Sequence, residues 1–200
     1  MLIEHQGKAP QIDATAQVAP TAVLSGEVRL GPGSCIGFGA VITAEGGPIE
    51  IGANCVIMEN AVIRASRRHP TRIGNHVLVG PGAYLTGCSV AERAFLATRS
   101  SVFNGAVVEA GAAVRINGTL HVNSRLPAGA VVPIGWVAVG DPAEVLPPGE
   151  HDAIWAVQKD LDFSGTCFGV ARLPDGGLDM VEITRRYTAF LQRHKDDRIL

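Results

Sequence analysis

The sequence is poor in aromatic and charged residues. Aromatic side chains make up 5% of its 200 residues and charged ones 18%, and the formal net charge is -2. It therefore offers no broad basic surface, which argues against a nucleic-acid partner. No apolar run approaches the ~18 residues that a membrane span needs, and the N-terminal stretch MLIEHQGKAP lacks the order of a secretory signal. We expect a cytoplasmic protein that binds neither membrane nor nucleic acid.

Cysteine is also scarce and scattered. The four thiols are widely spaced, and none belongs to a CxxC pair or a Cys/His cluster of zinc-site spacing: Cys35, Cys55, Cys88 and Cys167. We interpret them as small buried apolar side chains. Cys88 lies beside the candidate site described below and keeps a chemical role as an alternative. Since 46% of the residues are apolar, the chain can bury a full core.

What the sequence has in abundance is an aliphatic or small apolar residue at every sixth position. The positions are Ile12, Val18, Leu24, Leu30, Ile36 and Ile42, then Ile51, Ile57 and Ile63, then Ile73, Val79, Leu85, Ala91, Ala97 and Phe103, and, after a five-residue step, Val108, Val114, Leu120, Leu126 and Val132. A six-residue unit forms one flat strand and one turn, so three units make a triangular coil with these residues stacked inside. The predicted fold is mainly β, a parallel β-helix of hexapeptide repeats.

The period is interrupted twice and then ends. Residues 43–50 and 64–72 are predicted to leave the coil as loops, and loops on a rigid scaffold often carry function. We expect the β-helix to occupy residues 1–146 and a C-terminal helical appendage to occupy residues 147–200. The appendage protects the last edge of the coil.

Apolar spacing predicts two helices in the appendage. The first covers residues 151–161, and a turn is expected at 174–177. The last helix covers residues 179–195. It is expected to pack one apolar face against the rest of the protein, formed by Met180, Ile183, Tyr187, Phe190 and Leu191.

Four stretches of the chain resemble the γ-class carbonic anhydrases. They are IDATAQVAPTAVLSGEVRLGPGSCIGFGAVI, PIEIGANCVIMENAVIRAS, TRIGNHVLVGPGAYLTGCSV and FLATRSSVFNGAVV. The resemblance implies a left-handed β-helix with a C-terminal helix packed alongside it. It also implies a homotrimer with active sites between the subunits.

The chemistry of that family needs three histidines on one zinc ion, with an open position for a water molecule. The resemblance places the three ligand positions at Arg64, Pro81 and Thr86. It places the family's supporting polar side chains at Thr43, Glu45 and Met58. We therefore expect no metal and no other cofactor, and no carbon dioxide hydration.

Arg64 is the most informative of these replacements, because a guanidinium suits a carboxylate or a phosphate. An ion pair with Glu45 or Glu59 is the alternative, and both carboxylates are either acid–base groups or solvated surface residues. Asn104 either faces the same cleft as Arg64 or forms a hydrogen bond within a corner of the coil. The predicted catalytic set is Glu45, Glu59, Arg64, Thr86 and Asn104. The predicted substrate-binding set is Arg64, Thr43, Met58 and Pro81.

The histidines offer a second route to a metal. A displaced site that uses His69 or His76 across a trimer interface is one interpretation, and solvated or hydrogen-bonded histidines are the other. Three further histidines lie outside the aligned pocket and form no recognisable constellation in the sequence: His5, His151 and His194.

Three functions remain open. The first is a zinc-free trimer that binds or converts a small anionic metabolite. The second is a hexapeptide-repeat acyltransferase or thioester-processing enzyme, for which His69 or His76 would have to act as the catalytic histidine. The third is an assembly scaffold without catalysis.

Overall fold

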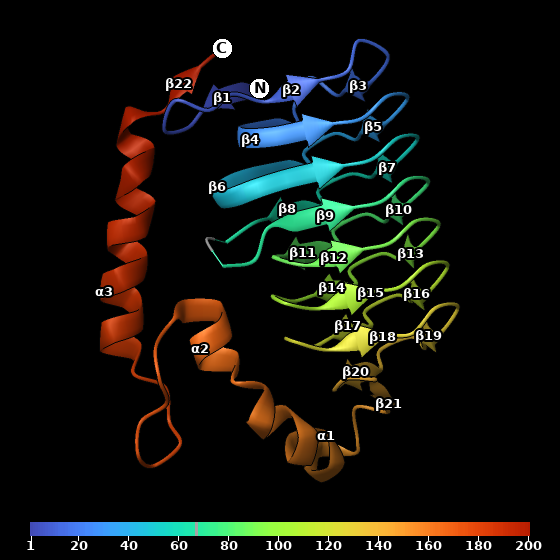
Figure 1. Ribbon diagram of the computed structural model, residues 1–200, viewed down its shortest axis with the longest axis vertical. Coiled ribbons are helices and arrows are strands. Elements are labelled where there is room, and N and C mark those ends of the chain that lie inside the picture. Colours follow the sequence, from blue (N-terminus) through green and yellow to red (C-terminus); the bar gives the residue numbers. More distant parts are fainter. Residues whose placement is uncertain (67) are drawn as a thin grey trace.

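The computed structural model describes residues 1–66 and 68–200, and it is a left-handed parallel β-helix with a helical segment beside it (Figure 1). Successive turns of the chain stack from the N-terminal end to the end that carries β20 and β21. Almost all neighbouring strands in the stack are parallel, so the backbone groups of each turn bond to the turns above and below. The predicted fold class is confirmed.

The first of two sheets has 15 strands and covers two sides of the coil. Two long strands, β4 (Val23–Leu30) and β6 (Val41–Ile51), continue from one side to the other. Each pairs with strands of both sides and so joins the two sides into one sheet. One side contains β1 (Leu2–Glu4), β8 (Val62–Arg64), β11 (Tyr84–Thr86), β14 (Ser101–Val102), β17 (Thr119–Leu120), β20 (Val137–Val139), β21 (Glu144–Leu146) and β22 (Arg198–Ile199). The other side contains β2 (Gln11–Ile12), β9 (Thr71–Ile73), β12 (Ser89–Val90), β15 (Val107–Val108) and β18 (Arg125–Leu126).

The second sheet forms the third side and has seven strands: β3 (Gln17–Val18), β5 (Cys35–Ile36), β7 (Val56–Ile57), β10 (Leu78–Val79), β13 (Phe95–Leu96), β16 (Ala113–Val114) and β19 (Val131–Val132). The second residue of each strand points inward and the first points outward. The outward side chains, with those of the corner that follows this sheet, form an exposed surface that we call the apolar face: Phe38, Val56, Phe95, Val131 and Ile134.

The first interruption of the repeat is not a loop, contrary to the prediction. Residues 43–50 lie within β6, which follows β4 along its length. The extra residues are accommodated by a register shift after Gly26, so that Val28 meets Ile49. The second interruption connects β8 to β9 through residues 65–70, whereas Arg64, Thr71 and Arg72 of the predicted loop lie in strands. Arg67 lies outside the described residues.

The predicted core residues are buried from Leu24 to Leu85 and again from Val108 to Val132, but the turn between them differs by one residue. The five-residue step falls after Leu85 rather than after Phe103. The side chains that stack inside this turn are Val90, Leu96 and Val102, opposite Ile73, Val79 and Leu85. Ala91, Ala97 and Phe103 therefore sit one position beyond the inward-facing sites. The corner at Gly87, with its positive φ, is one residue shorter than its neighbours.

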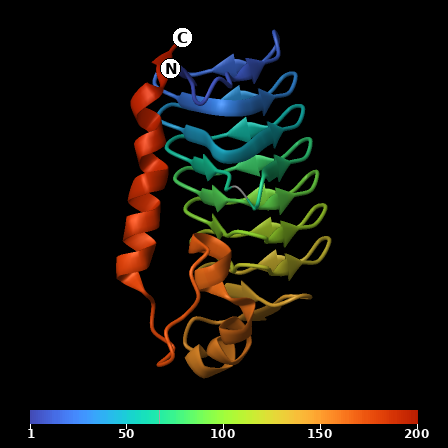
Figure 2. The same cartoon turned by 60° about the vertical axis from the view of Figure 1, so that its left-hand side comes forward.

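The C-terminal segment contains α1 (His151–Gln158), a 3-10 turn η1 (Lys159–Leu161), α2 (Phe163–Phe168), α3 (Met180–Leu191) and a 3-10 turn η2 (Gln192–Asp196). Figure 2 shows α3 running alongside the stack toward its N-terminal end. There β22 pairs antiparallel with β1, so both termini lie at the same end of the coil. Among the described residues, no helix has the length and apolar character needed to cross a bilayer.

The predicted apolar face of the last helix is only partly covered. Ile183 is buried, and Tyr187 and Phe190 are half-buried. Met180 and Leu191 are exposed, contrary to the prediction. The helix is therefore attached to the coil through a narrow apolar contact and through polar groups such as the hydroxyl of Tyr187.

Candidate functional site

Three neighbouring strands bring Thr43, Arg64 and Thr86 to one corner of the coil. Thr43 of β6 lies opposite Arg64 of β8, which lies opposite Thr86 of β11. Equivalent residues of adjacent strands stack about 4.8 Å apart, so the repeat itself builds this column. We call this region, with Glu45 and Asn104, the Arg64 corner.

Arg64 is held by two partners through a single nitrogen atom. Its Nη2 donates to Oε2 of Glu45 at 2.6 Å and to the hydroxyl of Tyr187 on α3 at 2.5 Å. Burial disfavours the charge of the guanidinium, but the ion pair with Glu45 outweighs burial and raises the pKa of Arg64 above its usual value. Nε and Nη1 have no hydrogen-bond partner among the described residues. Two nitrogens of the guanidinium, which carry three N–H donors, thus remain available to an anion.

Asn104 lies at the same corner and is buried. Its Nδ2 donates to Oγ of Ser66 at 3.4 Å, and its Oδ1 accepts from Sγ of Cys167 at 3.5 Å. Close packing explains the neighbouring Gly87, because a Cβ there would lie 2.7 Å from Nδ2 of Asn104 and 2.6 Å from Cβ of His69. Asn104 therefore matches the corner hydrogen-bonding alternative better than a ligand-facing role.

Met58, Glu59 and Pro81 lie at a different corner, the one that follows the second sheet, which we call the Pro81 corner. A hollow of about 340 Å³ there is lined by Glu59, Asn60, Pro81, Gly82, Thr98, Arg99, Ile116 and Asn117. Within one chain, the strands β8 and β11 separate this corner from the Arg64 corner. Of the two ion pairs considered for Arg64, the structure contains the one with Glu45 and not the one with Glu59.

The three residues at which the resemblance places the family's zinc ligands offer poor donors for zinc. A proline has no side-chain donor, a threonine hydroxyl is a weak one, and a guanidinium is a permanent cation. The residues Arg64, Pro81 and Thr86 therefore do not fit the ion that the resemblance implies. His69 and His76 also belong to no group of three potential ligands among residues 1–66 and 68–200.

A third cluster, formed by His5, His194 and Asp197, was not predicted from the sequence. His5 Nδ1 lies 2.6 Å from Oδ1 of Asp197, and His194 Nδ1 lies 2.7 Å from Oδ2 of the same carboxylate. The other ring nitrogen of His194 lies 3.6 Å from Oε1 of Glu45, which links this cluster to the Arg64 corner. Pairing of β22 with β1 brings these residues together, and no local sequence signal announces that pairing.

Known proteins with similar sequences include γ-class carbonic anhydrases. No family model matches the chain. A γ carbonic anhydrase of Arabidopsis thaliana, described as mitochondrial, is 34% identical over 108 residues, which is 51% of this chain and 39% of the plant protein. A carbonic anhydrase of Geobacillus kaustophilus is 30% identical over 108 residues, 54% of this chain and 59% of that protein. The predicted resemblance to γ-class carbonic anhydrases is confirmed. The matched stretch spans only about two fifths of the length of the γ carbonic anhydrase from Arabidopsis.

Solved structures that resemble this γ-carbonic-anhydrase-like chain are hexapeptide-repeat proteins. A hexapeptide transferase family protein from Anaplasma phagocytophilum superimposes with a TM-score of 0.53 at 25% identity, covering 94% of this chain and 96% of that one. A Bacillus cereus protein described as a putative acetyltransferase gives a TM-score of 0.52 at 19% identity, covering 95% and 90%, and shows the shared fold alone.

Proposed function

We propose that the protein is a γ-carbonic-anhydrase-like homotrimer that holds no zinc at the family position and binds a small anion at Arg64. The observation that carries this proposal is the partly occupied guanidinium. Its Nη2 is used by Glu45 and Tyr187, whereas Nε and Nη1 have no partner among the described residues. A planar fork of N–H donors suits a carboxylate, a bicarbonate or a phosphate.

The donor set at the three positions that the resemblance indicates argues against zinc there. Zinc in proteins is bound by imidazole, thiolate or carboxylate groups. The three family positions hold none of these, and Arg64 adds a positive charge. We therefore expect carbon dioxide hydration at the background rate.

The division of the predicted residues between two corners supports a trimer. We infer that the Pro81 corner of one copy faces the Arg64 corner of the next, so that Pro81 and Met58 close the anion site from the neighbouring subunit. The apolar face adjoins the Pro81 corner and would be buried in this contact, which offsets the cost of leaving it in water. A cytoplasmic location remains a prediction.

Binding is favoured over conversion. Glu45 is paired with Arg64 and is not a free base, and Asn104 is engaged with Ser66 and Cys167. A reaction would depend on Glu59 from the neighbouring copy, which lines the hollow at the Pro81 corner.

The test measures assembly and anion binding on tag-free protein. Light scattering is expected to give about three times the chain mass of 20.9 kDa. Bicarbonate, acetate and inorganic phosphate are then titrated calorimetrically against wild type and Arg64→Gln. We expect at least one anion to bind wild type and to bind the variant about tenfold to a hundredfold more weakly, because a charge-assisted hydrogen bond contributes ~1.5–3 kcal/mol.

Arg93→Gln is the matched control, since Arg93 is exposed and pairs only with the adjacent Glu92 among the described residues. It is expected to leave binding unchanged. A monomer at micromolar concentration, or equal anion affinity in wild type and Arg64→Gln, would contradict the proposal.

A hexapeptide acyltransferase is the second candidate, and the Anaplasma phagocytophilum structure favours it because its resemblance extends over nearly the whole of both chains. The hollow at the Pro81 corner is where an acyl carrier such as coenzyme A would lie between copies. Stabilisation of the protein by acetyl-coenzyme A, abolished by Ile116→Glu in that hollow, would favour this function over anion binding.

A further inference from the structure

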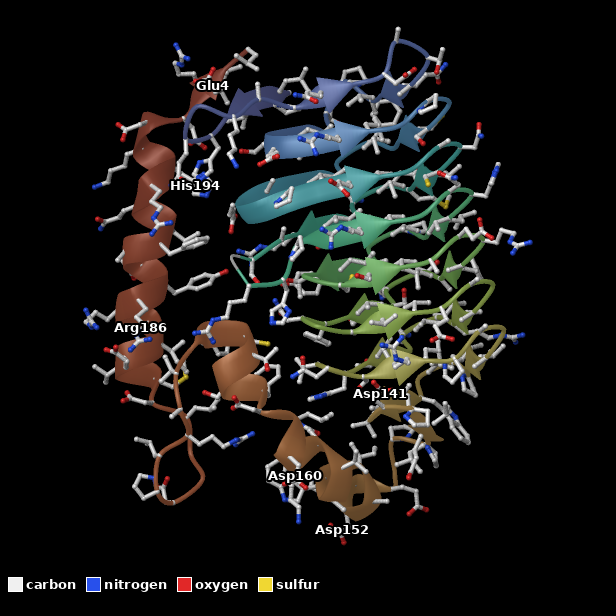
Figure 3. The ribbon with its side chains drawn as sticks, viewed as in Figure 1. Glu4, Asp141, Asp152, Asp160, Arg186 and His194 are labelled. Carbon is white, nitrogen blue, oxygen red and sulfur yellow. The ribbon has the colours of Figure 1, made fainter. Side chains whose placement is uncertain are left out.

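The two ends of the chain meet at the N-terminal end of the coil. His194 in η2, which follows α3, and Glu4 in β1 both lie there (Figure 3). Glu4 pairs with Arg198, and the adjoining residues His5 and Asp197 are in direct contact. The rings of His5 and His194 stack with their centroids 4.4 Å apart. One ligand atom from each of the two histidines and from Asp197 all lie within 4.8 Å of one another.

We propose that His5, His194 and Asp197 bind a divalent metal ion of the zinc class. Two imidazole nitrogens and one carboxylate oxygen form a ligand set that zinc accepts, and three protein ligands leave one coordination position open. The site is distinct from the family's zinc position, because it uses the first coil and the C-terminal segment. It does not depend on the function proposed above.

The surroundings of His194 match those of a metal ligand. A metal-bound histidine almost always donates its other ring N–H to a carboxylate, a carbonyl or water. Oε1 of Glu45 lies 3.6 Å from Nε2 of His194, slightly beyond hydrogen-bond distance, and a small movement of either side chain would let it accept that proton. The other oxygen of Glu45 is bound by Arg64, so the guanidinium faces a carboxylate rather than the ion.

The proton balance also permits metal binding. A carboxylate only accepts hydrogen bonds, so without metal each Nδ1 carries the proton that it donates to Asp197. An ion that takes the Nδ1 lone pairs displaces these protons to Nε2 or to solvent, and each metal-bound imidazole then carries its N–H on Nε2. At His194 the proton on Nε2 faces Oε1 of Glu45.

The cluster is reachable although His5 itself is buried. A hollow of about 210 Å³ adjoins it, lined by His5, Gln6, Lys8, Glu27, Ala44, Glu45, Gly46, Gly47 and Arg193. The positive charge of Lys8 in this hollow is paired with Glu27. A bound ion would fix the C-terminal segment to the first turn of the coil, and with it the helix that carries Tyr187.

The experiment titrates metal-depleted, tag-free protein with zinc by calorimetry and with cobalt by visible absorption. We expect one zinc per chain and the absorption of a four-coordinate cobalt site. His194→Ala and Asp197→Ala are expected to lower zinc affinity more than a hundredfold. Glu45→Gln is expected to lower it about tenfold to a hundredfold, the usual effect of losing an outer carboxylate.

His151→Ala is the control, since His151 is exposed and lies on α1. Thermal melts of every variant without metal identify any that fail to fold. If a variant does not fold, the cobalt spectrum of the wild type still tests the proposal, because it requires no substitution. The proposal is overturned if the wild type takes up no zinc, if uptake survives in folded His194→Ala and Asp197→Ala, or if uptake is instead lost in His69→Ala or His76→Ala.

Discussion

The coil and the C-terminal segment are built on different principles. In the coil, a buried aliphatic side chain at each repeat stacks on the next turn, from Leu24 to Val132. In α3, only Ile183 is buried, and Val181 is 80% exposed. The segment is attached to the coil largely by polar groups, including the contacts of Tyr187 with Arg64 and of Asp197 with His5. The coil therefore supplies stability, whereas the segment determines which polar groups surround the candidate sites.

The largest effect is expected from placing a charge inside the coil. Ile57→Asp or Val79→Asp buries an unpaired carboxylate at a fully buried position, which costs several kcal/mol out of a total stability of ~5–15 kcal/mol. We expect neither variant to fold, as measured by circular dichroism and thermal melting. Val181→Asp, at an exposed position of α3, is the control and is expected to melt like the wild type. A normal melt for either coil variant would show that the register is wrong.

A functional change is expected from restoring the family's ligands in the coil. The triple variant Arg64→His, Pro81→His and Thr86→His is predicted to bind one zinc per chain more than the wild type, because three imidazoles then meet across the proposed subunit contact. Elemental analysis measures this. The same variant in a His194→Ala background separates the new zinc from any ion held by the C-terminal segment. No additional zinc in the triple variant would contradict the placement of the Pro81 and Arg64 corners in one site.

The contrast between coil and segment also explains how much the sequence could predict. A strict period reports on local geometry that recurs, so it predicted the fold class and most of the buried aliphatic residues. In one turn the predicted core positions are one residue too late, because Val90, Leu96 and Val102 point inward. The period could not show this, since the neighbouring residues Ala91 and Ala97 are apolar and fit it equally well. It also predicted a loop at residues 43–50, where a register shift between β4 and β6 keeps the chain in the sheet.

The candidate site was predictable only where it belongs to the repeat. The column of Thr43, Arg64 and Thr86 follows from stacking, and the ion pair of Arg64 with Glu45 was one of the alternatives considered. Tyr187 as a partner of Arg64 was not predictable. Its position depends on the path of the C-terminal segment, which has no period. The meeting of His5 with Asp197 across 192 residues has the same cause.

The smallest expected effect is a difference in alkylation rate between one thiol of the coil and one thiol of the C-terminal segment. Burial raises the pKa of Cys88 in the coil to about 12 and that of Cys167 in α2 to about 11, from an ordinary value of 9.0. Alkylation needs the thiolate, so both are predicted to react slowly at pH 8 and faster as the pH rises toward these values. Above pH 9 the unfolded chain loses these protons first, so both thiols also lower stability as the pH rises.

The difference between the two thiols then reports on how each region opens. Cys167 is half-buried in a short helix and is expected to react through local opening, whereas Cys88 is fully enclosed and reacts only when the coil unfolds. Iodoacetamide labelling at pH 8 and 9, followed by mass spectrometry, is therefore predicted to modify Cys167 well before Cys88. A Cys167→Ala variant confirms the assignment of the faster phase. Equal labelling rates would mean that the coil and the C-terminal segment unfold as one unit, and the division of roles proposed here would fail.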